Sequence, residues 1–515
     1  MAGRLESDRA VTRILLRTAR AVPAAFLALF FAWPVAAMLA AHLRWGAVTD
    51  VLGDSSLRGV AWFTLWQALA STALAIVVGM PVTWALSRWR FVGSRLLTGL
   101  VTVPFLMPAV VIATGVAALL PSRGIPAILW AHTAFNVAVV VRVVGPVWSM
   151  VDRAQLESAA SLGAAPWHVF VDVSWPAIRD AVRNAAALVF AFCFSSFAVV
   201  RILGGASLRT LETEVFVQAV NLGDARTATA LTVLQTAVVL GVLAAARGGR
   251  GVAVESNDIV GSSPLAERAA WWWTPPVIAV LGAVVVVAPL AAVMVRSVRL
   301  DGAWTLAGWR ALFDGTLERV GIDTWAVLRT SVLFAVATVC IAVPLAVLVC
   351  RRERAGFAER ASLAPLLVSS VTLGLGLVVT FDTAPFDWRA EAWLLPVVHA
   401  VVALPLAVRA VGPSLRSIGT DLLESAADLG ASPGRVWRSV QMPLLRPALA
   451  RAAGISAAVS LGEFGATSFL SRSGTMTVPI AIGQLMGRPG TLLQQAAFAL
   501  AALAACAAAV FAARG

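Results

Sequence analysis

Few side chains in this 515-residue chain combine the types and the spacing that chemistry requires. The histidines show no metal-ligand spacing, and the cysteines form no Cys-x-x-Cys pair and lie in or at the ends of apolar runs. These residues are His42, His132, His168 and His399, and Cys193, Cys340, Cys350 and Cys506. No acid, histidine or nucleophile is grouped with a base at a predicted surface. The sequence therefore predicts no catalytic residue, no metal site and no enzyme activity.

One carboxylate stands out because it lies in an apolar segment. Glu463 is flanked by Gly462 and Gly465. An ionisable group inside a membrane costs roughly 2.5–3.5 kcal/mol on insertion scales, so it usually lines a cavity or has a partner. A second apolar segment, 267 residues earlier, carries Ser196 at the matching position and Arg201 near its end. Two interpretations stay open: a polar pathway lined by Glu463, or a structural ion pair with Arg201.

The positive charge of the chain consists of arginine alone. All 40 Lys and Arg residues are arginines, and the formal net charge is +13. A Walker A loop needs a lysine to reach the β- and γ-phosphates, so the chain has no conventional P-loop. The arginines are spread over many short loops and do not form the basic face typical of nucleic-acid binding. Any ATP hydrolysis is therefore expected from another subunit, and no nucleic-acid partner is expected.

A short polar motif occurs twice. Eleven of the twenty residues from Glu157 to Pro176 are identical to those found 267 residues later, without a gap. The residues singled out in the two copies are Glu157, Ala159, Ala160, Gly163, Pro166 and Pro176, and Glu424, Ala426, Ala427, Gly430, Pro433 and Pro443. Such a repeat indicates a tandem duplication in which each copy presents the same surface to something outside the membrane.

The order of residues in the motif predicts two short helices joined by a fixed bend. The alanine-rich start favours helix, and Gly163 can end that helix in the left-handed conformation. Pro166 suits the first turn of a second helix, and Pro176 is expected to close the element. Glu157 and Glu424 could each pair with an arginine of a partner. The alternative is an ordinary amphipathic loop on the lipid headgroups, although a matched pair of copies argues against it.

Composition and apolar runs indicate an all-α polytopic membrane protein. Hydrophobic residues make up 59% and charged residues 13% of the chain, against roughly 45–50% and 25% in soluble proteins. Twelve runs reach the length of about twenty residues that a spanning helix needs. They lie near 21–43, 60–86, 97–120, 126–149, 181–203 and 227–246, and near 274–296, 326–350, 361–382, 392–412, 448–470 and 491–513.

The runs divide into two halves of six. We expect a first repeat at 1–246 with its motif at 152–180, a cytoplasmic linker rich in Gly, Ser and charge at 247–270, and a second repeat at 271–515 with its motif at 419–447. Most arginines lie in segments that are cytoplasmic if the N-terminus is, which places both termini and both motifs inside the cell. Six spans per half make the repeats parallel.

The Glu-Ser-Ala-Ala motif, with its glycine and its closing hydrophobic-Pro pair, resembles the EAA signature of ABC importer permeases. The resemblance covers both halves, and the fused architecture is similar to that of iron(III) and thiamine permeases. The stretch from Cys193 to Gly205 favours thiamine. The resemblance implies coupling loops that dock on two copies of an ABC ATPase, a solute-binding protein outside the cell, and a multi-pass location in the bacterial inner membrane. It also implies that this chain binds no cofactor and that the partner uses the ATP.

In this interpretation Glu463, Ser196 and Arg201 are candidates for the translocation path, where Glu463 would attract a cationic solute. The main alternative is a secondary transporter of the major facilitator type, which also has twelve spans in two parallel halves. Such a protein would carry an acidic residue in the loop after its second span, but residues 87–95 contain none. That alternative also leaves the duplicated motif unexplained.

Overall fold

The computed structural model describes residues 21–120, 122–205, 207–246, 263–264, 273–351, 355–382, 386–389 and 391–514. Within these ranges the chain is almost entirely helical, which confirms the all-α prediction. Nine of the described helices are long and apolar enough to cross a membrane, and a bent pair makes a tenth if it is counted as one span. Most of the predicted linker, 247–270, lies outside the described residues, as does the arginine-rich start of the chain.

The first half begins with the helix Ala21–His42, which includes the π-turn η1 (Ala28–Ala32) and α2 (Trp33–His42). The helices that follow are α3 (Trp45–Gly53), α4 (Ser55–Arg88), α5 (Ser94–Leu106), α6 (Ala109–Leu119), α7 (Ile125–Ser149), α8 (Arg153–Ser161), α9 (Pro166–Val169), η2 (Phe170–Ser174), α10 (Trp175–Phe194), α11 (Ala198–Leu203), α12 (Leu211–Phe216), η3 (Val217–Asn221) and α13 (Ala225–Ala246).

The second half repeats this order. Its helices are α14 (Thr274–Ser297), α15 (Ala307–Ala311), η4 (Glu318–Val320), α16 (Thr324–Cys350), α17 (Ala355–Ser362), η5 (Ala364–Leu367), α18 (Ser370–Thr380), α19 (Leu394–Arg416), α20 (Thr420–Asp428), α21 (Pro433–Val436), η6 (Trp437–Gln441), α22 (Met442–Gly462), α23 (Gly465–Leu470), η7 (Ser473–Thr475), α24 (Val478–Met486) and α25 (Thr491–Arg514). Two minimal strand pairs complete the chain: β1 (Trp89–Arg90) beside β2 (Ser263–Pro264), and the hairpin of β3 (Arg299–Leu300) and β4 (Ala303–Trp304).

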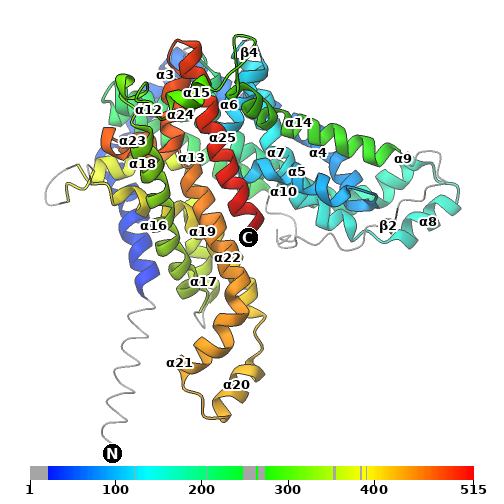
Figure 1. Cartoon of the computed structure of the whole chain (residues 1–515). Helices are drawn as coiled ribbons and strands as arrows, with labels where there is room; N and C mark the ends of the chain where they lie inside the picture. The colour runs from blue at the N-terminus through cyan, green and yellow to red at the C-terminus, as the bar shows by residue number, and fades with distance from the viewer. Residues whose placement is uncertain are drawn as a thin grey trace, which may run out of the picture.

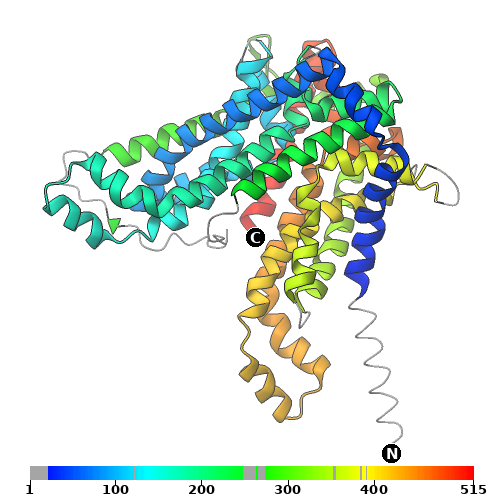
Figure 2. The same ribbon diagram turned by 180° about the vertical axis from the view of Figure 1, so that it is seen from behind.

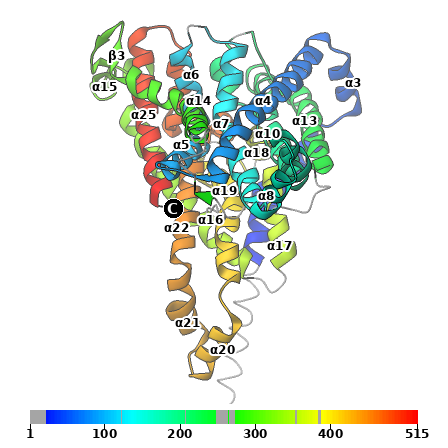
Figure 3. The same cartoon turned by 90° about the vertical axis from the view of Figure 1, so that its right-hand side faces the viewer.

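The long helices form two arms that meet at one end and diverge toward the other (Figures 1 and 2). One arm contains α4, α5, α7 and α10, and the other contains α16, α19 and α22. Short helices, among them α6, α12, α18, α23 and α24, fill the end where the arms meet. Figure 3 looks toward the first arm and shows α20 and α21 projecting from the second.

Four of the twelve predicted spans are interrupted helices, and one of them, the run near 448–470, breaks between Gly462 at the end of α22 and Gly465 at the start of α23. The run near 97–120 bends by 103° between α5 and α6, where Met107 is extended ahead of Pro108. The run near 361–382 contains only the short apolar helix α18, preceded by η5. In the run near 181–203 the helix α10 stops at Phe194 and α11 starts at Ala198. Apolar composition indicates that these segments are buried, but it does not reveal breaks that backbone geometry introduces.

The first helix of each half packs against the other half. Helix α14 lies along α4, α5 and α6, whereas α2 lies along α18. Two glycines allow these close approaches: a Cβ on Gly115 would lie 2.1 Å from the carbonyl oxygen of Pro289, and a Cβ on Gly376 would lie 3.0 Å from that of Pro34. Small residues at such crossings allow helices in a membrane to pack closely. The two halves are therefore interlocked.

Candidate functional site

The two copies of the duplicated motif form exposed helical elements at the tips of the two arms. The first docking element comprises α8 and α9, and the second comprises α20 and α21 (Figure 1). None of the residues in these four helices is buried. All four helices are therefore accessible to an external partner at the free ends of the two arms.

The bend between the two helices of each docking element has the same backbone geometry. Gly163 and Gly430 adopt φ angles of 85° and 78°, in the left-handed region that other residues avoid. The amide of Ala164 donates to the carbonyl of Ala159 at 3.1 Å, and the amide of Ala431 donates to that of Ala426 at 3.0 Å. This pattern is the Schellman helix end expected from the sequence.

The residues next to the bend also match between the copies. Pro166 and Pro433 each occupy the first position of the second helix, where no amide hydrogen is needed. Glu157 is exposed and pairs with Arg153 on the preceding turn of α8. Glu424 is exposed on α20. Both carboxylates therefore face solvent, although that of Glu157 already has a cation within its own helix.

Sequence reasoning missed an apolar residue in each docking element. Leu162 and Leu429 occupy equivalent positions directly before the glycines, and each is 89% exposed. Ala160 and Ala427 are also exposed, whereas Ala159 and Ala426 are half-buried. A fully exposed leucine is costly to keep in water and is an anchor of the kind that fills a partner's pocket. In the sequence, the feature that could have indicated these residues was a leucine present in both copies between polar and small residues.

Each docking element is continuous with a long helix. Residues 166–194 run without interruption through α9, η2 and α10, and residues 433–462 run through α21, η6 and α22. Pro176 and Pro443 do not close the elements as expected, because the helix continues through a π-turn that ends two residues before each proline. A helix of this length spans about 40 Å. Displacement of a docking element is therefore transmitted to the far end of its helix.

Both long helices end beside the contact between the halves. Phe197 follows α10, and its equivalent Phe464 follows α22. The two rings are in contact, with centroids 5.5 Å apart. Phe197 also meets Phe216 at 5.4 Å, and Phe216 meets Phe469 edge to face at 5.2 Å. Four phenylalanines, two from each half, thus pack together at the end where the arms meet.

The three candidate pathway residues lie around this aromatic contact. Glu463 lies at the break between α22 and α23, where its carboxylate accepts a hydrogen bond from the amide of Ala466 at 2.9 Å. Ser196 occupies the equivalent break before Phe197 and is half-buried. Arg201 is exposed, and its guanidinium lies 5.7 Å from the ring centre of Phe216. Among the described residues no ion pair joins Arg201 to Glu463.

Hydrogen bonds at equivalent positions occur in the two halves. The amide of Leu211 donates to Thr64 Oγ1 at 2.9 Å, and 267 residues later the amide of Val478 donates to Ser331 Oγ at 2.8 Å. These bonds attach α12 to α4 and α24 to α16. The short helices at the meeting end are therefore fixed to the long helices of their own half.

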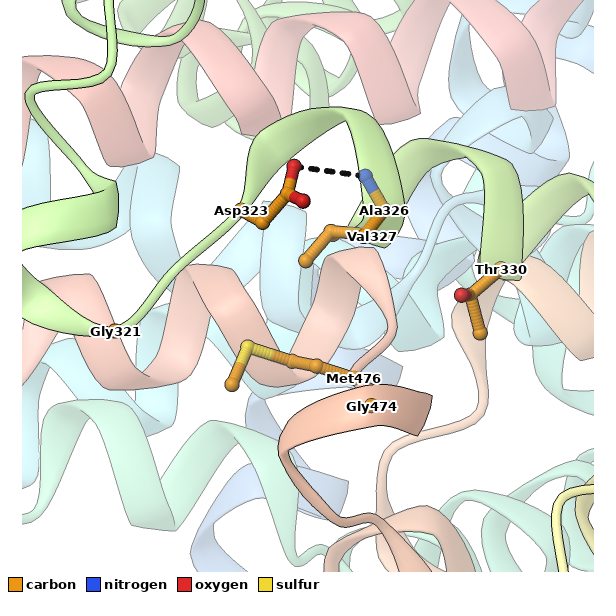
Figure 4. Close-up of a pocket in the computed structure, with 7 residues that line it drawn as sticks. All are labelled: Gly321, Asp323, Ala326, Val327, Thr330, Gly474 and Met476. Carbon is orange, nitrogen blue, oxygen red and sulfur yellow. Dashed lines mark hydrogen bonds between the residues drawn. The ribbon is translucent and has the colours of Figure 1, made fainter.

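A small open pocket lies apart from these features (Figure 4). Asp323 is the charged residue among those that line it, and its carboxylate accepts from the amide of Ala326 at 3.0 Å. This bond caps the start of α16. The carboxylate therefore has a structural role, and the pocket offers no other charged group to a ligand.

Comparison with known proteins adds an independent finding. The chain is 26% identical to the thiamine transport system permease protein ThiP of Escherichia coli, over 88% of this chain and 89% of that protein. It is 27% identical to the protein of the same name from Brucella abortus, over 84% and 83%. A probable ABC transporter permease protein of Sinorhizobium fredii is 25% identical over 87% and 86%. No family model matches the chain.

Proposed function

We propose that this chain, the membrane-spanning permease subunit of an ABC importer, couples two ATPase copies to solute passage through its two docking elements. The chain is a transport subunit and not an enzyme, and ATP is hydrolysed by a partner. The relatives' similarity extends over nearly the whole chain, which supports the fused arrangement. The observation that carries the coupling proposal is the pair of exposed elements with matching bends at the ends of the two long helices.

In the proposed mechanism each ATPase subunit binds one docking element. Leu162 and Leu429 enter apolar pockets, and Glu157 and Glu424 contact cationic groups around them. When ATP brings the ATPase subunits together, the tips of the arms approach each other. Because residues 166–194 and 433–462 are continuous helices, this movement reaches the contact of Phe197 with Phe464 and separates the rings. Opening at one end thus follows closure at the other.

The membrane orientation follows from the same assignment. The docking elements and both chain ends lie on the cytoplasmic side, and the aromatic contact lies toward the outside. In this orientation the two arms meet at the proposed outer end and diverge toward the proposed ATPase side (Figures 1 and 2). A solute-binding protein delivers its cargo at the outer end. Thiamine is the proposed cargo, because the relatives that match over most of the chain are named for thiamine transport.

The experiment that tests this proposal is reconstitution in liposomes with an ABC ATPase and a thiamine-loaded binding protein. We expect thiamine accumulation that requires ATP on the cytoplasmic side and is lost when the ATPase is omitted. Accumulation by the chain alone, driven by a proton or sodium gradient, would contradict the proposal and favour a secondary transporter.

A further inference from the structure

Two buried carboxylates lie at the contact between the halves and have no role in the docking elements. Glu212 belongs to α12 of the first half and is 1% exposed, while Glu463 belongs to the second half and is 6% exposed. Helix α12, which carries Glu212, and helix α23, which starts two residues after Glu463, both pack against α18. Both lie beside the start of α18, where Ser369 adjoins Glu212 and Ser370 adjoins Glu463. The acids of opposite halves therefore share one small region.

Each of these carboxylates has one oxygen with a close hydrogen-bond partner, and a serine hydroxyl, that of Ser369 or Ser370, lies near each acid. Glu212 Oε1 accepts from the side-chain amide of Gln235, and Glu463 Oε1 accepts from the amide of Ala466. Glu212 Oε2 and Glu463 Oε2 have no hydrogen-bond partner in the part of the chain that the structure describes. Burial of an acid without a partner is unfavourable, so the arrangement needs a compensating ligand or function.

A neighbouring acid shows that a buried glutamate in this part of the fold can have a cationic partner. Glu214 lies two residues further along α12 and is 4% exposed. Its carboxylate pairs with Arg209 at 3.3 Å and accepts from Gln218 at 2.8 Å. The fold thus provides a cation for one buried glutamate of α12, whereas no ion pair to Glu212 occurs among the described residues.

An aromatic contact between the halves follows Glu463 directly in the chain. Phe464 directly follows Glu463 and contacts Phe197 of the other half. The face of an aromatic ring attracts a cation within about 6 Å of its centre. Carboxylate oxygens would neutralise the charge of an organic cation, and the rings would cover its apolar body.

We propose that Glu212 and Glu463, with Phe197 and Phe464, form a transient binding site for an organic cation such as a thiazolium or quaternary ammonium group. The site opens when the two halves separate at this end, and in the closed state the rings fill it. This inference rests on the proposed function, because ATP-driven separation of the halves is needed to expose the site. It deepens that function by assigning the solute class to named residues of both halves.

The test uses the complete complex of permease, ATPase and thiamine-loaded binding protein in liposomes. Glu212→Gln and Glu463→Gln are each expected to lower thiamine uptake by about tenfold, because one charge-assisted contact with the solute is lost. ATP hydrolysis stimulated by the loaded binding protein is expected to stay within about twofold of wild type. Glu463→Asp should recover part of the uptake. Glu214→Gln, the matched buried acid, should transport normally.

A second measurement needs no variant of these acids. In the wild-type complex during turnover, thiamine is expected to slow modification of Glu212 and Glu463 by a hydrophobic carbodiimide, as measured by mass spectrometry. Equal modification with and without thiamine would overturn the site.

Normal uptake by both glutamine variants would also overturn the site. So would a loss of both thiamine uptake and stimulated ATP hydrolysis, because the acids would then be needed for coupling or folding and not for binding of the solute. A wild-type complex that fails to transport with ATP would instead contradict the proposed function.

Discussion

Phe197 and Phe464, equivalent residues of the two halves, place their rings in contact with centroids 5.5 Å apart. Each ring directly follows a break after a continuous helix that starts in a docking element. The exposed docking elements are therefore joined to the end where the arms meet by one helix in each half. This relationship links the duplicated motif to solute passage in physical terms, because a rigid helix transmits displacement along its whole length.

Replacement of both exposed leucines should weaken binding of the ATPase without lowering the stability of the permease. Leu162→Asp with Leu429→Asp removes two apolar anchors and places charges where a partner's pocket would be, so we expect the ATPase to be lost during co-purification. The melting temperature in detergent should not fall, because both side chains are 89% exposed. Leu52→Asp is the matched control, because Leu52 is an exposed leucine of α3 and lies outside both docking elements. This variant should retain the ATPase. Retention by the double variant would argue against an anchor role.

The glycines of the two bends should not tolerate a side chain. Gly430→Val forces a β-branched residue into a φ angle of 78°, which costs roughly 1–2 kcal/mol and distorts the bend. ATP-driven uptake should fall, and adding Gly163→Val should abolish it. Gly434→Ala is a suitable control, because a Cβ there meets nothing within 4 Å. Equal uptake by Gly430→Val and Gly434→Ala would show that the bend is not needed for coupling.

The interlocked first helices should depend on small residues at their crossings. Gly115→Leu places a side chain against the backbone of Pro289, and such overpacking typically costs about 1–3 kcal/mol. We expect a lower melting temperature in detergent. Gly241→Leu on α13 adds the same side chain where nothing lies within 4 Å and should melt near wild type. If the two variants were equally stable, α14 would not pack on α6 as described.

The sequence predicted the class of fold and the two short helices with their bend in each motif, because both rest on local chemistry. Long apolar runs, a glycine that ends a helix and a proline that starts one act within a few residues of each other. The left-handed conformation of Gly163 and Gly430 is such a local consequence.

What could not be predicted depends on tertiary structure. Pro176 and Pro443 were expected to end an element, but π-turns keep both helices continuous, and no local signal distinguishes the two outcomes. Glu463 stood out by composition, whereas Glu212 did not, because it lies in a polar stretch that becomes buried only when α12 packs between the long helices. The packing of α14 on the first half likewise involves contacts far apart in sequence.

The most direct test of the central claim is a covalent cross-link between positions 197 and 464. In a background with the four native cysteines replaced by alanine, Phe197→Cys with Phe464→Cys would be cross-linked by a short bifunctional thiol reagent in the complex with ATPase and binding protein. The account predicts that a cross-link through reducible disulfides abolishes the ATP-driven thiamine uptake of the double variant. Reduction should return uptake to the level of the uncross-linked double variant, which lacks the two rings and so transports less than wild type. Undiminished uptake with the two positions fully cross-linked would contradict it.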